Sequence, residues 1–214
     1  MPTDRGYFLD ETFRMHPALT RAVSQLQYEG KLGSAPVTMM RELDGVPPGL
    51  MPVPVDHDAN TTSSPEEARV VVDLVRDLLG RTWMGARDGH LLDPRTMTEG
   101  DIIIVAAYNT QVRLLRRTLA DAGYGRIQVG TVDKFQGREE VIVIVSMATS
   151  SDQDLPRGIE FLLSPNRLNV AISRAQWACY LVHSPQLLAS QPVSVQGLQR
   201  LGSFLQLVSP MQHE

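Results

Sequence analysis

Polar side chains crowd into one short segment of the chain, between two stretches with the apolar character of strands. The segment 129–139 carries four of them within six residues, namely Lys134, Gln136, Arg138 and Glu139. A continuous apolar run follows directly, as expected for a strand that is buried on both faces. This density of hydrogen-bonding groups beside a buried strand indicates a ligand-binding loop rather than a simple connection.

Three arginines stand where elements of structure are expected to begin or end. Arg14 follows Phe13, Arg138 follows Gly137, and Arg174 lies near the end of a short predicted helix. The guanidinium group is always charged and presents a fixed fork of donors, so it can stabilise the charge that spreads over a phosphoryl group during transfer. Supplied from across a cleft, such a residue is an arginine finger.

A complete nucleotide hydrolase would also need a phosphate-binding loop and a magnesium site. No G-x-x-x-x-G-K-[ST] pattern occurs, because Gly30-Lys31 has no upstream glycine at the required spacing. No apolar strand ends in the Asp-Glu pair that would hold Mg²⁺. We therefore predict no metal site, and we expect this chain by itself to be inactive toward ATP.

The composition is that of an ordinary globular domain. The 214 residues are 43% hydrophobic and 21% charged, which is enough for one substantial α/β domain. The net charge of −4 argues against a nucleic-acid coat protein. Positive charge is nevertheless concentrated in the segment 111–138, where only Asp121 and Asp133 are acidic. The basic residues of that segment are Arg113, Arg116, Arg117, Arg126, Lys134 and Arg138.

Neither a membrane span nor a signal peptide is predicted. The chain has no run of about eighteen apolar residues, and charged residues interrupt its N-terminus, so the expected compartment is the cytoplasm. The first ten residues show no pattern that would open a domain, and we expect the chain to be a fragment of a longer protein. The single cysteine, Cys179, lies in an apolar run and is predicted to be a buried thiol.

Apolar periodicity and capping residues predict alternating helices and strands, with Ser64 and Asn109 as helix N-caps. The expected helices are 17–29, 65–79, 109–122, 185–189 and 195–208. The expected strands are 51–55, 101–107, 125–130, 141–146 and 178–183. Segments 31–64 and 81–99 are predicted to be rich in loops. The alternation predicts a single α/β domain over residues 1–214, with a mostly parallel sheet between layers of helices.

Four blocks of sequence, in the same order, resemble the motifs of one protein family. Residues 13–17 resemble Y-R-M-H-P, and residues 103–115 resemble a strand-to-helix block with P-Y-x-x-Q-x-x-L-L. Residues 131–139 resemble motif V, T-V-D-x-F-Q-G-x-E, and residues 167–175 resemble motif VI, R-L-N-V-A-[LI]-[ST]-R-A. Together they resemble the second, C-terminal RecA-like domain of superfamily-one helicases. The branch is that of the nonsense-mediated-decay helicase and its bacterial DNA-processing relatives.

This resemblance implies a RecA-like fold of the P-loop-NTPase type and a set of residues around ATP. Phe13 matches the aromatic that stacks on adenine, and Glu139 matches the acid that binds the ribose. Arg14 matches the arginine that reaches the γ-phosphate, and Arg174 matches the arginine finger, so the catalytic roles go to these two. Three further residues of motif V line the same side: Gln136, Gly137 and Arg138. The rest of the ATP cleft belongs to a preceding N-terminal RecA-like domain.

The resemblance also implies contact with a single strand of DNA or RNA. Thr131 matches the motif V hydroxyl residue near the nucleic-acid backbone, and Tyr108 and Asn109 are the other candidates. The chain is then expected to be the C-terminal motor domain of an ATP-dependent helicase, which uses ATP and Mg²⁺ in its full length, with no cofactor held tightly by this part. The Pro- and Gly-rich segment 45–66 and Asn166 further suggest a fused nuclease domain.

Two departures from the family and several plainer interpretations stand beside these roles. Phe13 replaces the usual tyrosine, which keeps the stacking but loses the hydroxyl. Ala106-Ala107 replaces Thr-Pro before Tyr108, which removes a hydroxyl that could contact a phosphate. Phe13 can also be a core aromatic, His16 a structural hydrogen-bonding residue, and the arginines of helix 109–122 its solvated face. The whole chain can also be a non-catalytic RecA-like module that docks a partner.

Overall fold

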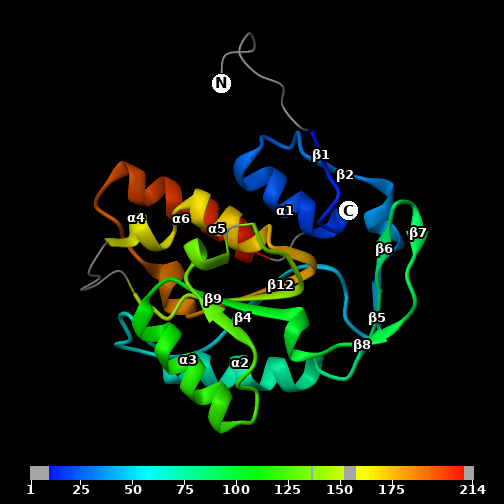
Figure 1. Ribbon diagram of the computed structural model, residues 1–214. Coiled ribbons are helices and arrows are strands. Elements are labelled where there is room, and N and C mark those ends of the chain that lie inside the picture. Colours follow the sequence, from blue (N-terminus) through cyan, green and yellow to red (C-terminus); the bar gives the residue numbers. More distant parts are fainter. Residues whose placement is uncertain (1–9, 136, 152–157, 210–214) are drawn as a thin grey trace.

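The computed structural model describes residues 10–135, 137–151 and 158–209 (Figure 1). Its centre is a five-stranded sheet with the order β10-β9-β11-β12-β4, in which every neighbouring pair is parallel. The strands are β4 (Gly49–Pro54), β9 (Ile102–Ala106), β10 (Gln128–Gly130), β11 (Glu140–Ser146) and β12 (Ala175–His183). The predicted α/β class with a parallel sheet is confirmed.

The central strands are apolar because both of their faces are covered. Every residue of β9 and all but the first of β11 are buried. Successive side chains of a strand point to opposite faces, so Ile103 and Val105 join one hydrophobic cluster while Ile102 and Ile104 join the other. The continuous apolar runs seen in the sequence therefore reflect two cores, one on each side of the sheet.

Helices cover both faces of the sheet and produce three layers (Figure 1). One face carries α2 (Pro65–Leu78) and α3 (Asn109–Asp121). The opposite face carries α1 (Pro17–Gln27), α4 (Gly158–Leu162), α5 (Pro165–Ile172) and α6 (Val195–Val208). Short 3₁₀ helices are η1 (Pro36–Met40), η2 (Glu99–Asp101), η3 (Val132–Phe135) and η4 (Pro185–Ala189). This is the RecA-like arrangement that the four motifs imply.

Local capping chemistry sets where the helices begin. Ser64 Oγ accepts the backbone N–H of the third residue of α2 at 3.0 Å, as predicted. His16 Nδ1 accepts a backbone N–H at the start of α1 at 3.2 Å, so this histidine has the structural role considered for it. The prediction that Asn109 caps α3 was wrong. The helix begins at Asn109, and its N-cap is Tyr108, whose side chain makes no capping hydrogen bond.

The two segments predicted as loops carry short strands, which are too brief for a period of two to be visible in the sequence. β3 (Glu42–Leu43), β5 (Thr82–Met84) and β8 (Arg95–Thr96) form an antiparallel sheet. β6 (Ala86–Arg87) pairs with β7 (His90–Leu91), and β1 (Glu11–Thr12) pairs with β2 (Gly33–Ser34). The helix predicted over residues 185–189 is present, as the 3₁₀ helix η4.

Tryptophans attach the small antiparallel sheet to the main sheet. Trp83 in β5 and Trp177 in β12 are both buried, and their rings meet edge to face with centroids 5.9 Å apart. Trp177 Nε1 donates to the carbonyl of Val46 at 2.9 Å, so the indole N–H does not lose a hydrogen bond on burial. Cys179 lies two residues further along β12, fully buried as predicted, and burial raises the pKa of its thiol.

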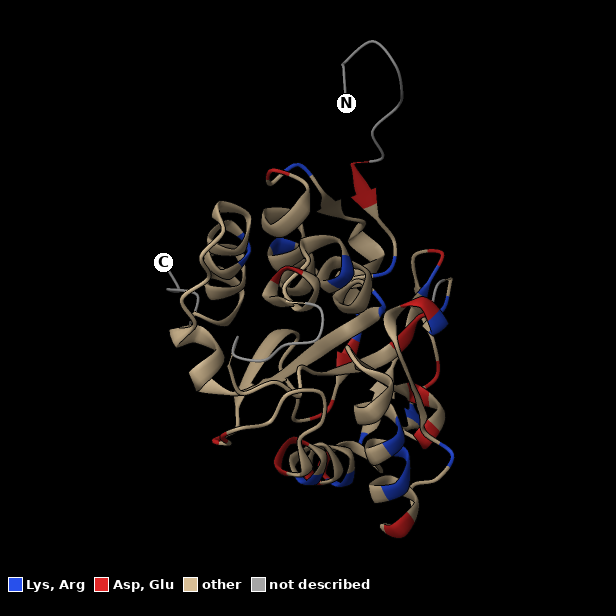
Figure 2. Ribbon diagram, turned by 90° about the vertical axis from the view of Figure 1, so that its left-hand side faces the viewer, with Lys and Arg blue, Asp and Glu red and all other residues tan. Residues whose placement is uncertain are grey.

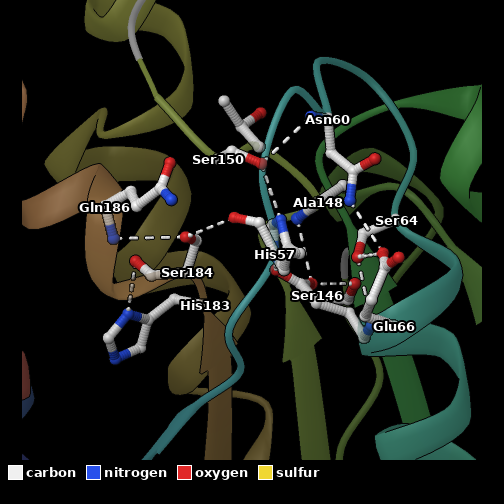
Figure 3. A network of polar contacts seen from close by, with 12 residues as sticks. His57, Asn60, Ser64, Glu66, Ser146, Ala148, Ser150, His183, Ser184 and Gln186 are labelled. Atoms are coloured by element: carbon white, nitrogen blue, oxygen red, sulfur yellow. Dashed lines mark hydrogen bonds and ion pairs between the residues drawn. The ribbon is translucent and has the colours of Figure 1, made fainter.

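A buried polar network ties α2 to the carboxyl end of β11 (Figure 3). Glu67 is fully buried; its Oε1 lies 3.1 Å from His57 Nε2, and its Oε2 accepts from Ser146 Oγ at 2.6 Å and from the N–H of Ala148 at 2.9 Å. His57 Nδ1 in turn lies 2.7 Å from Ser150 Oγ. A buried carboxylate is tolerated because donors surround it. The network therefore holds the loop between β4 and α2, and the loop after β11, against the sheet.

Within the described ranges, no helix combines the length and the apolar character that crossing a bilayer requires.

Candidate functional site

Motifs V and VI end side by side, at the edge of the sheet where its strands begin. Glu139 directly precedes β11, and Arg174 directly precedes β12. The N–H of Glu140 donates to the carbonyl of Arg174 at 3.0 Å, because the two parallel strands are neighbours in register. We call this the amino edge. It brings together two residues to which the sequence assigned parts of one site.

Arg14 reaches the amino edge from the other end of the chain. Its Nε lies 2.5 Å from Glu139 Oε2, and its Nη1 donates to the carbonyl of Ser173 at 2.9 Å. The two paired side chains remain 29% and 44% exposed, so the pair faces solvent rather than the core. One guanidinium therefore contacts both motif V and motif VI.

Phe13 stands at the surface beside this pair, with 68% of its side chain exposed. An aromatic ring of this size is usually buried, so the interpretation of Phe13 as a core residue is wrong. A solvent-facing ring that directly precedes Arg14 in the chain is instead available to stack on a planar group.

Among the described residues, Arg174 donates hydrogen bonds only to neutral partners. Its Nε donates to the carbonyl of Val170 at 3.0 Å and its Nη1 to the carbonyl of Arg138 at 3.3 Å. Partial burial lowers the pKa of Arg174, the charge of Arg14 lowers it further, and Glu139 opposes both. The two guanidiniums thus share a single carboxylate, and the amino edge carries a local excess of positive charge.

Two residues of the amino edge were not found from the sequence. Arg41, 9% exposed, donates from Nη2 to the carbonyl of Phe13 at 3.0 Å and from Nη1 to the carbonyl of Arg14. Gln176 donates from Nε2 to Glu139 Oε1 at 3.2 Å. Burial lowers the pKa of Arg41, while Glu139 opposes that shift. Arg41 lies in a segment predicted as loop, where nothing in the sequence distinguishes it from a surface arginine.

The remaining motif V residues of the predicted nucleotide site divide in three ways. Gly137 is exposed and has φ of 83°, a left-handed backbone conformation that favours glycine. Arg138 offers its carbonyl to Arg174 but turns its guanidinium away, onto Gln128 Oε1 at 2.5 Å. Gln136 lies outside the described residues.

The candidates for nucleic-acid contact lie at the opposite, carboxyl edge of the sheet. Asn109 follows β9 after Tyr108, and Thr131 follows β10. Asn109 is exposed and Thr131 is partly exposed, whereas Tyr108 is only 8% exposed and packs against Phe161, with ring centroids 5.9 Å apart. Tyr108 is therefore packed inside the domain at this edge, whereas Asn109 and Thr131 are accessible to solvent.

Motif V joins the two edges. It leaves the carboxyl end of β10 at Thr131, runs through η3 with Phe135 buried under it, and enters β11 after Glu139. Because β10, β9 and β11 are parallel neighbours, this segment must cross one face of the sheet, about 20 Å for seven strand residues at roughly 3.3 Å each. The helix α5 crosses the same face before Arg174.

Comparison with known proteins shows the family of this chain. A family model described as an AAA domain matches residues 3–186. The chain belongs to this AAA-domain family. The Regulator of nonsense transcripts 1 homolog of Arabidopsis thaliana is 31% identical over 201 residues, which cover 86% of the chain and 15% of that protein. DNA-binding protein SMUBP-2 of Rattus norvegicus is 28% identical over 183 residues, which cover 77% of the chain and 17% of that protein.

This AAA domain therefore spans about a sixth of the length of the curated relatives that it matches. Among solved structures, the C-terminal domain of a possible DNA helicase from Lactobacillus plantarum WCFS1 is similar, with 16% identity and a TM-score of 0.46. That match covers 82% of this chain and 89% of the solved one. The resemblance to the C-terminal RecA-like domain of superfamily-one helicases is confirmed by the family match and the curated relatives.

The amino edge of this AAA domain fits an adenine nucleotide. The exposed ring of Phe13 suits the base, the carboxylate of Glu139 suits ribose hydroxyls, and the guanidiniums of Arg14 and Arg174 suit phosphates. Magnesium prefers several oxygen ligands. Within the described ranges no group of three His, Cys, Asp or Glu side chains could hold a metal ion.

Proposed function

We propose that this AAA domain is the C-terminal motor domain of an ATP-dependent helicase acting on DNA or RNA, which supplies an arginine finger and part of the nucleic-acid track. The observation that carries the proposal is the convergence of Arg14, Glu139 and Arg174 beside the exposed ring of Phe13. These residues come from three distant parts of the chain, and a surface without a ligand has no need to gather them.

Each residue has a role that its surroundings support. Phe13 stacks on the base, and Glu139 accepts hydrogen bonds from ribose hydroxyls. Arg14 and Arg174 hold the γ-phosphate and stabilise the charge that develops on it during transfer. Arg41 is a positioning residue, because its donors fix the backbone carbonyls of the Phe13-Arg14 segment.

The partners of the two arginines favour Arg174 as the finger. Arg14 already has a carboxylate partner, Glu139, at 2.5 Å. Within the described part of the chain, Arg174 donates only to the carbonyls of Val170 and Arg138, so an approaching phosphoryl group meets a guanidinium that no described carboxylate contacts directly. A charge-assisted hydrogen bond to a phosphate is stronger than one to a neutral carbonyl, so Arg174 gains by exchanging partners.

The carboxyl edge supplies the track. Asn109 is exposed where α3 begins, and Thr131 is partly exposed after β10. The N–H groups at a helix start favour anions such as backbone phosphates. The relatives support a nucleic-acid partner, since one is named a DNA-binding protein and another a regulator of nonsense transcripts. Motif V then links the nucleotide site to the nucleic-acid contact, because it begins with Thr131 at the carboxyl edge and ends with Glu139 at the amino edge.

The P-loop and the magnesium carboxylates belong, in this proposal, to a preceding N-terminal RecA-like domain of the same protein. ATP binds between the two domains, and Mg²⁺ polarises its phosphates there. A fused nuclease domain remains a prediction from the sequence alone.

The test is to join the preceding domain to this chain and measure ATP hydrolysis with single-stranded DNA and with RNA. We expect nucleic-acid-stimulated hydrolysis that falls by about a thousand-fold in Arg174→Ala, as for a removed arginine finger. The 214-residue chain alone should hydrolyse no ATP. Comparing the two nucleic acids decides which one is the natural track.

The competing function is a non-catalytic RecA-like module that docks a partner. It predicts that the joined protein hydrolyses no ATP, or that Arg174→Ala leaves hydrolysis unchanged. Magnesium-dependent turnover by the isolated chain, lost in Arg174→Ala, would contradict both functions and indicate a complete small hydrolase.

A further inference from the structure

Three cationic side chains from three elements meet around the edge strand β10. Arg116 of α3 donates from Nη2 to the carbonyl of Val129 at 2.7 Å, and Lys134 of η3 donates from Nζ to the same oxygen at 3.2 Å. Arg138, beyond η3, donates from Nη1 to Gln128 Oε1 at 2.5 Å. All three basic residues are exposed. We call Arg116, Lys134 and Arg138 the β10 cluster.

No described carboxylate forms an ion pair with any member of the β10 cluster. Their hydrogen-bond acceptors are a carbonyl and a side-chain amide, which leave three full positive charges. Partial burial lowers the pKa of Lys134, and the charges of Arg116 and Arg138 lower it further. Asp133, next to Lys134, lies 3.7 Å from Arg167, and Glu139, next to Arg138, pairs with Arg14. The cluster therefore concentrates positive charge without a direct ion pair to a described carboxylate, and Glu140 acts on Arg138 only at longer range.

The backbone is shaped to bring Lys134 into this cluster. The lysine side chain lies over Gly130, where an added Cβ would come within 2.5 Å of its Cδ, so a larger residue there would displace the lysine side chain. A surface pocket of about 240 Å³ lies beside the cluster, with Arg116, Tyr124 and Lys134 among the residues that line it. Cations and an open hollow thus occupy the same place.

A plainer explanation is that these cations only protect the edge of the sheet. Lysine and arginine on an edge strand do discourage pairing with another chain. One cation on the Val129 carbonyl would be enough for that, whereas two share it and a third lies beside them. Basic residues also continue along α3, at Arg113 and Arg117 (Figure 2). Edge protection does not account for this accumulation.

We propose that the β10 cluster binds phosphate groups of a nucleic-acid strand. Backbone phosphates are always charged, recur along the strand and accept several donors at once, which matches three converging cations. This contact rests on the proposed helicase function, and it adds a place where the strand is held at the side of the sheet, apart from the track residues of the carboxyl edge.

The experiment measures fluorescence anisotropy of labelled oligothymidylate and oligouridylate with the 214-residue chain over a series of NaCl concentrations. The test variant is Arg116→Gln with Lys134→Gln, and the matched control is Arg113→Gln with Arg117→Gln, which removes the same amount of positive charge, in this case from α3 alone. Circular dichroism melting checks that both variants are folded. Arg138 stays unchanged because the sequence also assigns it to the predicted nucleotide site.

We expect the test variant to bind about ten-fold more weakly at low salt, with the slope of log K against log salt reduced by about 1.4, since each lost phosphate contact of a single strand removes roughly 0.7. The control should lose about two-fold through its general charge. Equal losses in the two variants would overturn the proposal, because the effect would then be the field of the whole helix.

Further arms separate this proposal from the helicase function itself. Inorganic phosphate and ATP, added as competitors, should displace the oligonucleotide no better than NaCl of equal ionic strength. Displacement by either one specifically, lost in the test variant, would show that the cluster serves free phosphate compounds and would overturn the assignment to nucleic acid. If Asn109→Ala with Thr131→Ala weakens binding while the test variant does not, the track stands and the β10 cluster proposal fails.

Discussion

The guanidinium of Arg14 and the carboxylate of Glu139 meet at 2.5 Å although 125 residues separate them in the chain. The same guanidinium reaches the carbonyl of Ser173, next to Arg174. Three sequence motifs therefore converge on one polar point at the amino edge. Because the pair is partly exposed, its value lies more in placing groups for a ligand than in holding the fold together.

Glu139→Gln tests whether Glu139 serves ligand binding rather than the stability of the fold. A half-exposed ion pair contributes about 0.5 kcal/mol, so the free energy of unfolding should change little. In the joined two-domain protein, the loss of the charged ribose acceptor should raise KM for ATP several-fold, by about 1–2 kcal/mol of binding. Urea unfolding and steady-state kinetics measure the two effects. A large loss of stability with unchanged KM would assign Glu139 to the fold instead.

Arg41→Met is expected to disturb the site through the backbone. It removes the donors to the carbonyls of Phe13 and Arg14 and leaves these acceptors to water or to no partner, at a cost of about 1–3 kcal/mol in stability. The displaced Phe13-Arg14 segment should also lower kcat for ATP hydrolysis in the joined protein. Arg41→Lys, which keeps a charge but not the fork, should recover part of the kcat. Equal kcat in the wild-type and Arg41→Met proteins would remove its positioning role.

Glu67→Gln should be one of the most destabilising single substitutions in this chain. Glutamine keeps only one of the two oxygens, so its N–H₂ group faces either the donors of Ser146 and Ala148 or the ring of His57, and the carboxylate charge is lost in a place without access to water. The expected loss is about 3 kcal/mol in the free energy of unfolding. Asp73→Asn, on the same helix in an exposed pair with Arg76, is the matched control and should cost under about 0.5 kcal/mol. Similar losses for both would contradict the importance of the buried network.

Asp101 should make the stability depend on pH in the acidic range. Burial raises the pKa of Asp101, but hydrogen bonds from Arg95 and Thr98 outweigh it and hold the pKa below its usual value. A lowered folded pKa gives stability that is present above the unfolded value of about 3.9 and is lost as the pH falls through the folded value. Asp101→Asn should therefore cost about 2 kcal/mol at pH 7 and less near pH 3. Urea unfolding at both pH values measures this, and an equal cost at the two would refute it.

The main elements of the fold were predictable because their signals are local. Continuous apolar runs marked β9 and β11, and Ser64 with its following proline and acids marked α2. The short strands β3 and β5 to β8 were not predictable, since two or three residues show no period and their stability comes from contacts such as Trp83 with Trp177. Asn109 was misplaced as a cap because its residue type suits that position, while the chain turns one residue earlier.

The candidate site was only partly predictable from local sequence signals. The motifs named Phe13, Arg14, Glu139 and Arg174, since their residue types and spacing are specific. Arg41 was missed, because a buried arginine that donates to backbone carbonyls has no signature in the sequence.

By itself, the sequence determined the family, the alternating elements and the residue types that can meet a nucleotide, because these depend on local spacing and composition. Only the tertiary structure decided which of those residues meet. The parallel register of β11 and β12 places Glu139 beside Arg174. The fold also directs the guanidinium of Arg138 toward β10 and its carbonyl toward Arg174. The tertiary structure also buries Tyr108 and exposes Phe13. Burial and side-chain direction depend on distant parts of the chain, and no local pattern contains them.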